Sequence, residues 1–168
     1  MLVKINKSLV GDNQPTYFIA DIGANHDGNL SRAKKLIKLC AKAGANAAKF
    51  QHFKAETIVS DYGFKKLKVK THQSNWKQNV FEVYKKASIN MNWTNELKKT
   101  CKKFNIDFFT SPYDLDYVDQ LNEHICAYKI GSGDITWTEI ISKISKKNKP
   151  TIIATGASNM RDVERVYK

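Results

Sequence analysis

The sequence has few cysteines, and it lacks both a signal peptide and a long apolar run. No apolar run approaches the roughly 20 residues that a membrane-spanning helix needs. The first eight residues lack the apolar core of a secretory signal. The three cysteines, Cys40, Cys101 and Cys126, form neither a CxxC pair nor a zinc-ligand pattern. We therefore expect a cytoplasmic protein with reduced thiols and no membrane partner.

Arginine is scarce although the chain is strongly basic. Only Arg32, Arg161 and Arg165 are arginines, against 28 basic residues in total and a formal net charge of +12. Base recognition and bidentate phosphate contacts favour arginine. Many of the lysines instead come in adjacent pairs on predicted helix surfaces. The charge therefore predicts a solvated surface that attracts an anionic substrate, and no nucleic-acid partner.

A strand-like segment followed by a helix-like segment recurs five times. The predicted strands cover residues 17–22, 46–51, 106–111, 127–130 and 151–155. The predicted helices lie between Asn29 and Gly44, over 80–87, from a Thr94 cap to Asn105, over 115–121 and 137–146, and near Lys168. Such units build a parallel sheet whose ligands bind at the carboxyl ends of the strands. Residues 52–76 form a long polar connection, which is often functional in a compact domain.

The length of 168 residues suits one domain but not a closed barrel. A complete (β/α)8 TIM barrel typically needs about 250 residues. The pattern therefore predicts an α/β fold that is either an open five-stranded sheet or the first part of a TIM barrel.

Two lysines lie inside otherwise apolar strands, near the carboxyl ends. Lys49 points to the same side as Gln51, because side chains alternate along a strand, and Lys129 repeats the pattern before a Gly-Ser-Gly turn. A lysine in such a strand is costly unless it meets an anion or a carboxylate. With Ser111 and Ser132, the lysines predict a phosphate site. The structural alternative is a buried lysine paired with an aspartate of a neighbouring strand.

Asp21 and Asp134 are the carboxylates at these strand ends. They either hold the two lysines in place or bind substrate hydroxyls and transfer protons. Asp134 shares the direction of Ser132 if the chain stays extended there. Three roles are open to His26: metal ligand, substrate contact or turn residue. One histidine without a partner at ligand spacing does not predict a metal site.

Five motifs, in order along almost the whole chain, resemble the N-terminal part of sialic acid (N-acetylneuraminate) synthases. The motifs cover residues 18–28 (FIADIGANHDG), 43–51 (AGANAAKFQ), 109–112 (FTSP), 127–134 (AYKIGSGD), and 149–150 (KP) with 154–156 (ATG). Five motifs in one order are far more specific than any one of them alone.

The resemblance implies a TIM-barrel enzyme of carbohydrate biosynthesis, with residues 1–168 as a partial, truncated domain of five strand–helix units. The implied reaction condenses phosphoenolpyruvate with N-acetylmannosamine or a related N-acyl amino sugar, giving a nine-carbon 2-keto sugar acid and phosphate. A divalent metal, Mn²⁺ or Mg²⁺, is implied, with ligands outside this chain. A homodimer is also implied, in which a C-terminal antifreeze-like domain, absent from these residues, reaches the partner's active site. These residues alone are expected to be incomplete as an enzyme.

The resemblance also assigns roles to individual residues. The implied substrate-binding residues are Lys49, Gln51, Ser111, Lys129 and Ser132. The two lysines and the two serines hold the phosphate and carboxylate of phosphoenolpyruvate. Gln51 and Asp21 contact the sugar or the reacting centre. Asp21 and Asp134 are the implied catalytic carboxylates, and Asp134 lies beside the carbon that becomes positively polarised.

Three positions depart from the family. Glutamate is usual where this chain has Asp21 and Asp134, and a phosphate-binding serine is common where it has Ala154. Each aspartate shortens the side chain by one methylene, roughly 1.3 Å of reach. A misplacement of about 1 Å can cost on the order of 100-fold in rate. The two aspartates therefore predict a different sugar or a reshaped site, and Ala154 leaves one phosphate contact missing.

Two other functions stay open. A related aldolase-type enzyme that condenses phosphoenolpyruvate with another sugar would share the lysines and the barrel. A truncated, non-catalytic remnant would bind phosphate or a partner chain instead.

Overall fold

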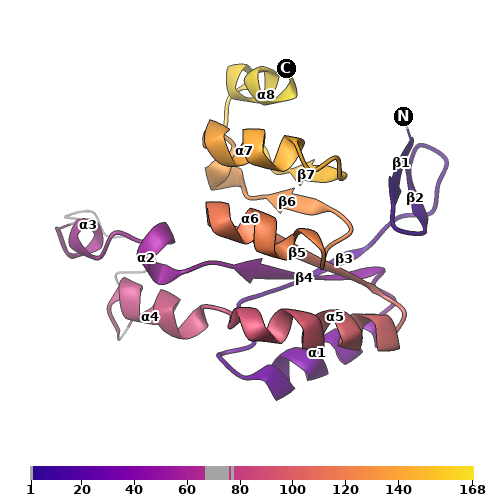
Figure 1. Ribbon diagram of the computed structural model, residues 1–168, viewed down its shortest axis with the longest axis horizontal. Coiled ribbons are helices and arrows are strands. Elements are labelled where there is room, and N and C mark those ends of the chain that lie inside the picture. The colour runs from indigo at the N-terminus through magenta and orange to yellow at the C-terminus, as the bar shows by residue number, and fades with distance from the viewer. Residues whose placement is uncertain (1, 67–75, 77) are drawn as a thin grey trace.

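Five parallel strands form one sheet in the order in which they follow along the chain. The computed structural model describes residues 2–66, 76 and 78–168. The strands are β3 (Ile19–Gly23), β4 (Ala47–His52), β5 (Asp107–Pro112), β6 (Tyr128–Ile130) and β7 (Thr151–Ile153). All five predicted strands are present, so the predicted α/β architecture is confirmed (Figure 1). Each strand pairs only with its neighbours in sequence, as the strands of a barrel do.

Four of the described helices pack on one face of the sheet, namely α1 (Leu30–Lys42), α5 (Thr94–Lys103), α6 (Leu115–Asn122) and α7 (Thr138–Ser145). The helix α8 (Met160–Tyr167) follows β7 and has no buried residue. Alternate strand residues such as Ala48, Phe50 and Phe108 join Ile37 of α1 and Leu97 of α5 in the main hydrophobic core. Because side chains alternate along each strand, the neighbours of these residues face the opposite side of the sheet, called here the inner face.

A short antiparallel hairpin covers part of the inner face. Its strands are β1 (Leu2–Ile5) and β2 (Ser8–Gly11), and neither was predicted from the sequence. Ile5 packs with Ala47 and Phe109 in a second, smaller core. Asp107 accepts hydrogen bonds from Asn6 Nδ2 (2.6 Å) and from the Tyr17 hydroxyl (2.5 Å). The hairpin is thereby attached at the amino ends of the strands.

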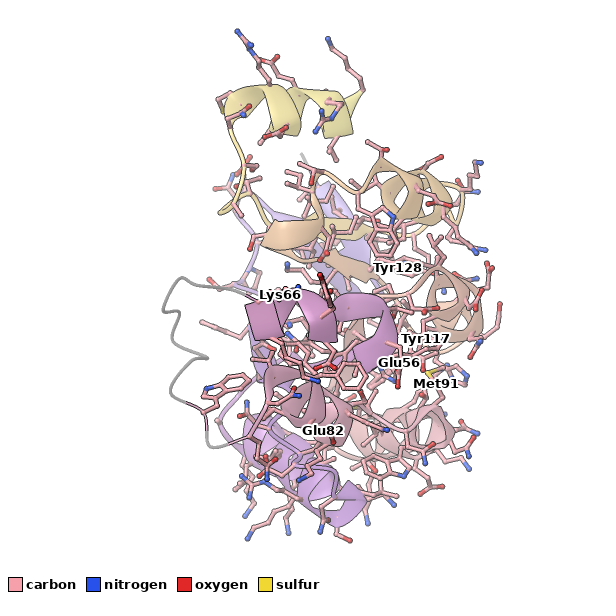
Figure 2. All side chains as sticks on the ribbon, turned by 90° about the vertical axis from the view of Figure 1, so that its left-hand side faces the viewer. Glu56, Lys66, Glu82, Met91, Tyr117 and Tyr128 are labelled. Carbon is pink, nitrogen blue, oxygen red and sulfur yellow. The ribbon has the colours of Figure 1, made fainter. Side chains whose placement is uncertain are left out.

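The connection after β4 contains three helices. Among the described residues these helices are α2 (Ala55–Ile58), α3 (Asp61–Lys66) and α4 (Val80–Ala87), of which only α4 was predicted. Figure 2 looks onto the carboxyl ends of the strands, with the segment that carries Glu56 and Lys66 in front of them. Most of the remaining connection, residues 67–75 and 77, lies outside the described residues. None of the described helices is long and apolar enough to cross a membrane.

Three of the predicted helix ends can be compared with the structure. The Asn29 side chain accepts a hydrogen bond from the backbone of Arg32, and Gly44 has a left-handed φ of +87°, so both predicted ends of α1 are confirmed. The prediction that Thr94 caps α5 is wrong, because Thr94 is its first helical residue. The Thr94 hydroxyl instead lies 3.1 Å from Nε2 of the buried His52.

Candidate active site

Most of the predicted site residues lie together on the inner face, at the carboxyl ends of the strands. Asp21 is aligned with Lys49, and Gln51 with Ser111, in the register of the neighbouring strands. Lys129 of β6 lies on the same face, because it alternates with the core residues Tyr128 and Ile130. The parallel sheet therefore gathers side chains that are more than 100 residues apart in the sequence.

Lys49 is buried and paired with Asp21. Its Nζ lies 2.8 Å from Asp21 Oδ1, while its side chain is only 10% exposed and that of Asp21 is 60% exposed. The register of β3 shifts between Asp21 and Gly23. A Cβ on Gly23 would lie 3.8 Å from the Gln51 amide, so the two segments approach closely. The ion pair expected by the structural alternative is present, and it leaves the carboxylate open to solvent.

Lys129 has a different environment. Its Nζ donates a hydrogen bond to the backbone carbonyl of Ile130 at 2.6 Å. Burial and the nearby Lys49 charge lower the pKa of Lys129. Among the described residues, neither Asp134 nor any other carboxylate forms an ion pair with it. Asp134 acts on the Lys129 ammonium group through its charge, without the direct ion pair that Asp21 makes with Lys49.

Ser132 and Asp134 do not share one direction. The chain is not extended there, because residues Ser132–Asp134 form a 3-10 turn in which the Asp134 amide donates to the Gly131 carbonyl. A Cβ on Gly131 would lie 2.7 Å from Asp134 Oδ2, so the carboxylate folds back over Gly131. Burial raises the pKa of Asp134. Ser132 instead lies beside Gly156, the glycine that follows β7.

Tyr113 also belongs to this cluster, although it was not among the residues predicted from the sequence. Its hydroxyl would lie 3.0 Å from a Cβ on Gly131, beside the Asp134 carboxylate. The hydroxyl also interacts with Ser111. The signal was available, because the alternation that places Gln51 with Lys49 also places Tyr113 with Ser111.

His26 is fully buried in the loop after β3. Its Nδ1 accepts a hydrogen bond from the backbone amide of Gly28, and its ring lies edge-on to Trp93 at 5.9 Å. Of the three roles considered, the structure therefore shows that of a turn residue. No three His, Cys, Asp or Glu side chains gather as metal ligands in the part of the chain that the structure describes. The described residues thus do not by themselves form a metal site.

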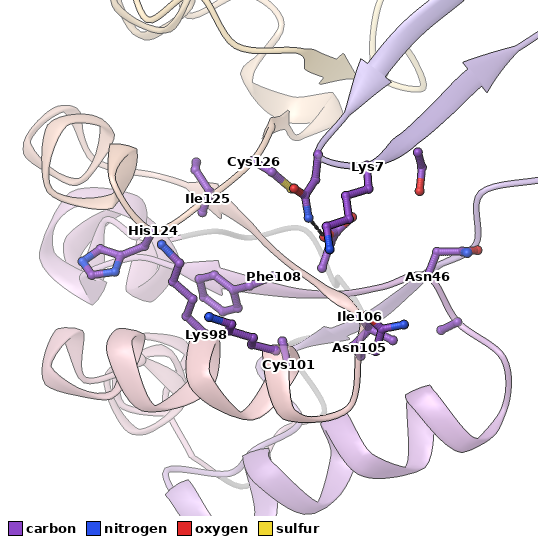
Figure 3. Close-up of a pocket in the computed structure, with 15 residues that line it drawn as sticks. Lys7, Asn46, Lys98, Cys101, Asn105, Ile106, Phe108, His124, Ile125 and Cys126 are labelled. Carbon is purple, nitrogen blue, oxygen red and sulfur yellow. Dashed lines mark hydrogen bonds between the residues drawn. The ribbon is translucent and has the colours of Figure 1, made fainter.

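A hollow lies at the amino ends of the strands, opposite the candidate site (Figure 3). It has a volume of about 700 Å³, and its lining includes Lys98, Asn46 and Ile125, which lie on α5 or precede strands of the sheet. None of the predicted site residues lines it. The hollow at the amino ends of the strands and the candidate site at their carboxyl ends therefore share none of the predicted site residues.

Comparison with known proteins identifies relatives of this chain. Residues 36–168 match the NeuB family. N,N'-diacetyllegionaminic acid synthase of Campylobacter jejuni is 39% identical over 151 residues, which are 89% of this chain and 45% of that enzyme. N-acetylneuraminate-9-phosphate synthase of Homo sapiens is 29% identical over 160 residues, which are 95% of this chain and 44% of that enzyme. The chain spans less than half the length of these relatives.

A solved structure shares the fold. The crystal structure of N-acetylneuraminic acid synthetase from Leptospira borgpetersenii, in complex with citrate, matches with a TM-score of 0.81 and 25% identity. The match covers 99% of this chain and 54% of that one. The predicted fold, the first five strand–helix units of a TIM-type barrel, is therefore confirmed. The predicted resemblance to sialic acid synthases is confirmed as well, and the chain belongs to the NeuB family.

Proposed function

We propose that the protein that contains this chain condenses phosphoenolpyruvate with N-acetylmannosamine or a related N-acyl amino sugar. The products are a nine-carbon 2-keto sugar acid and inorganic phosphate. The observation that carries the proposal is the pair of lysines on the inner face of the sheet, near the carboxyl ends of β4 and β6, with β5 between them. Lys49 has a carboxylate partner, and Lys129 is without one among the described residues. Such a pair suits a substrate that carries both a phosphate and a carboxylate.

The side chains around the lysines supply further donors to the anion. We assign Lys49, Ser111, Lys129 and Ser132 to the phosphate and carboxylate of phosphoenolpyruvate. Ser111 is buried at the end of β5, and Ser132 begins the turn after β6. Each charge-assisted hydrogen bond contributes roughly 1.5–3 kcal/mol. Fixed donors of this kind hold the enol in place for attack, which is the main task in joining two substrates.

The sugar lies, in this proposal, beside Asp21 and Gln51. The enol carbon of phosphoenolpyruvate attacks the open-chain aldehyde of the sugar, whose oxygen then takes a proton. Water adds to the adjacent carbon, and the tetrahedral intermediate expels phosphate to leave the 2-keto group. Asp134, whose pKa is raised by burial, lies at the end of the site where this carbon becomes positively polarised. Its carboxylate stabilises that charge.

A divalent metal, Mn²⁺ or Mg²⁺, belongs to the proposal through the family resemblance alone. Its ligands are assigned to residues outside this chain. The cytoplasmic location, the homodimer and a C-terminal antifreeze-like domain in the partner's site are likewise proposals about the whole protein.

The shortened carboxylates favour a second candidate, the condensation of phosphoenolpyruvate with a different aldehyde sugar. Asp21 and Asp134 each reach roughly 1.3 Å less than glutamate. Asp21 is the more informative, because its carboxylate is exposed beside the proposed sugar position.

Phosphate release from phosphoenolpyruvate tests the proposal. The assay compares this chain with the product of the longest reading frame that contains it, with N-acetylmannosamine and Mn²⁺ present. We expect sugar-dependent release from the longer protein. Release with an aldehyde sugar that carries no N-acyl amino group, and with no N-acyl amino sugar, would favour the second candidate. Absence of release with every aldehyde sugar would support a non-catalytic protein.

A further inference from the structure

The hydroxyl groups of three buried or half-buried tyrosines differ in their hydrogen-bond partners. The Tyr17 hydroxyl donates to Asp107 at 2.5 Å, and the Tyr128 hydroxyl donates to the carbonyl of Val118 at 2.8 Å. The Tyr113 hydroxyl instead forms a hydrogen bond with the Ser111 hydroxyl and lies beside the Asp134 carboxylate. The first two tyrosines are therefore bonded within the fold, and the third faces the candidate site.

The positions of the Tyr113 hydroxyl and the Asp134 carboxylate require a residue without a side chain at position 131. Its φ of −66° and ψ of 159° are values that any residue can adopt, so glycine is not needed for the backbone conformation. A Cβ at this position would lie 2.7 Å from Asp134 Oδ2 and 3.0 Å from the Tyr113 hydroxyl. The missing side chain therefore lets two oxygen atoms occupy the space over the end of β6.

The ring of Tyr113 is fixed from the other side. Phe53 lies edge-on to it with ring centroids 6.5 Å apart, and Phe53 in turn contacts Tyr84 of α4 at 5.6 Å. Burial, followed by the charge of Asp134, raises the pKa of Tyr113. The hydroxyl therefore keeps its proton at neutral pH and remains a hydrogen-bond donor.

We propose that Tyr113 is a further substrate-binding residue, whose hydroxyl donates a hydrogen bond to an anionic oxygen of the three-carbon substrate between Ser111 and Asp134. The inference rests on the proposed function, because it takes phosphoenolpyruvate as the ligand. Ala154 has no hydroxyl to offer this anion, and Tyr113 supplies a neutral donor in its place.

Calorimetric titration with phosphoenolpyruvate tests the inference on the product of the longest reading frame that contains this chain. Tyr113→Phe keeps the ring and its contact with Phe53 but removes the donor. We expect the dissociation constant of phosphoenolpyruvate to rise roughly 10- to 100-fold, as for loss of a hydrogen bond to a charged group. The matched control is Tyr17→Phe, which removes a hydroxyl bonded to Asp107 at the other end of the sheet. The control should keep the wild-type affinity.

The outcomes separate this inference from the proposed function. If the wild-type protein binds phosphoenolpyruvate and Tyr113→Phe binds it equally well, the role of Tyr113 is refuted and the function stands. If the wild-type protein does not bind phosphoenolpyruvate, the proposed function and the inference both fail. If Tyr113→Phe and Tyr17→Phe weaken binding equally, the effect is one of general stability, and the inference is again refuted.

Discussion

Lys49 and Asp21 form an ion pair across two neighbouring parallel strands, with 2.8 Å between Nζ and Oδ1. The lysine side chain is almost completely buried, whereas most of the aspartate side chain is exposed. Removal of the carboxylate would leave a buried ammonium group without its partner, and removal of the ammonium group would leave a carboxylate that water can solvate. The two residues are therefore not equivalent, although they make a single contact.

Substitution of Asp21 is expected to separate binding from turnover. Asp21→Asn removes the negative charge beside Lys49, so phosphoenolpyruvate should bind at least as tightly as to the wild-type protein. Sugar-dependent phosphate release should fall about 100-fold, because a group at the reacting centre is lost. Kinetics at saturating phosphoenolpyruvate check this. Asp27→Asn is the control, because Asp27 is exposed in the following loop and pairs with Arg32. Equal activity of Asp21→Asn and Asp27→Asn would contradict the assigned role.

Substitution of Lys129 is expected to weaken phosphoenolpyruvate binding without unfolding the protein. Lys129→Ala removes an ammonium group whose protein partner is a backbone carbonyl and not a carboxylate. We expect the dissociation constant to rise roughly 10- to 100-fold, with a melting temperature close to that of the wild-type protein. Calorimetry and thermal melting measure the two effects. Lys146→Ala, on an exposed helix end, carries the same charge change as a control. Unchanged affinity in Lys129→Ala would refute the role.

Substitution of Gly131 is expected to disturb the site while the fold is kept. In Gly131→Ala the new methyl group collides with Asp134 Oδ2 and the Tyr113 hydroxyl, although the backbone conformation suits alanine. Both oxygen atoms must move, so kcat/KM for phosphoenolpyruvate should fall at least about 10-fold. The control is Gly133→Ala, two residues away, where a Cβ would meet no atom within 4 Å. A loss of activity of the same size in both variants would show that the collision at Gly131 is unimportant.

Acid is expected to destabilise the protein through His52. Its ring is fully buried, with Nδ1 2.7 Å from the Thr110 hydroxyl, and burial lowers its pKa to about 3. In the unfolded chain the pKa is near 6.5, so the unfolded state binds the proton first as the pH falls. The stabilisation by neutral His52 is complete above about pH 6.5 and is lost progressively between that pH and about 3.

Urea denaturation at several pH values measures this effect. The free energy of unfolding should fall by up to about 1.4 kcal/mol per pH unit from this residue. His52→Gln should show a shallower dependence, even though it is less stable at pH 7. His124→Gln is the comparison, because His124 is only partly buried and should change the slope less. The same slope in His52→Gln as in the wild-type protein would contradict the prediction.

The strands could be predicted because each one is an apolar run that ends in polar residues. The end of α1 could be predicted because Gly44 adopts a left-handed conformation there. The hairpin could not be predicted, since its strands have four residues each and Leu2 and Leu9 are exposed. Its position depends on Ile5 packing against β4 and β5, a contact between distant segments that no local pattern contains.

In the candidate site, too, local patterns predicted some positions, whereas contacts between distant residues could not be predicted. Alternation along the strands correctly placed Gln51 on the side of Lys49, because a strand has a fixed period. It did not apply to Asp134, because the chain turns at Ser132 and the side chain folds back over Gly131. Thr94 was predicted as a cap from its residue type, whereas its hydroxyl lies against buried His52. Turns and buried hydrogen bonds depend on neighbours that only the folded chain brings together.

The contacts of Asp107 also set an order of events during synthesis on the ribosome. Asn6 and Tyr17 bind a residue that lies 101 and 90 positions further along the chain. At about 5–20 residues per second, the hairpin waits roughly 5–20 s before its partner is made. During that interval the emerging segment offers exposed apolar side chains to chaperones or to other nascent chains. The hairpin is therefore made before β5, the strand whose Asp107 its turn residue Asn6 binds, and it reaches its final place only after β5 is made.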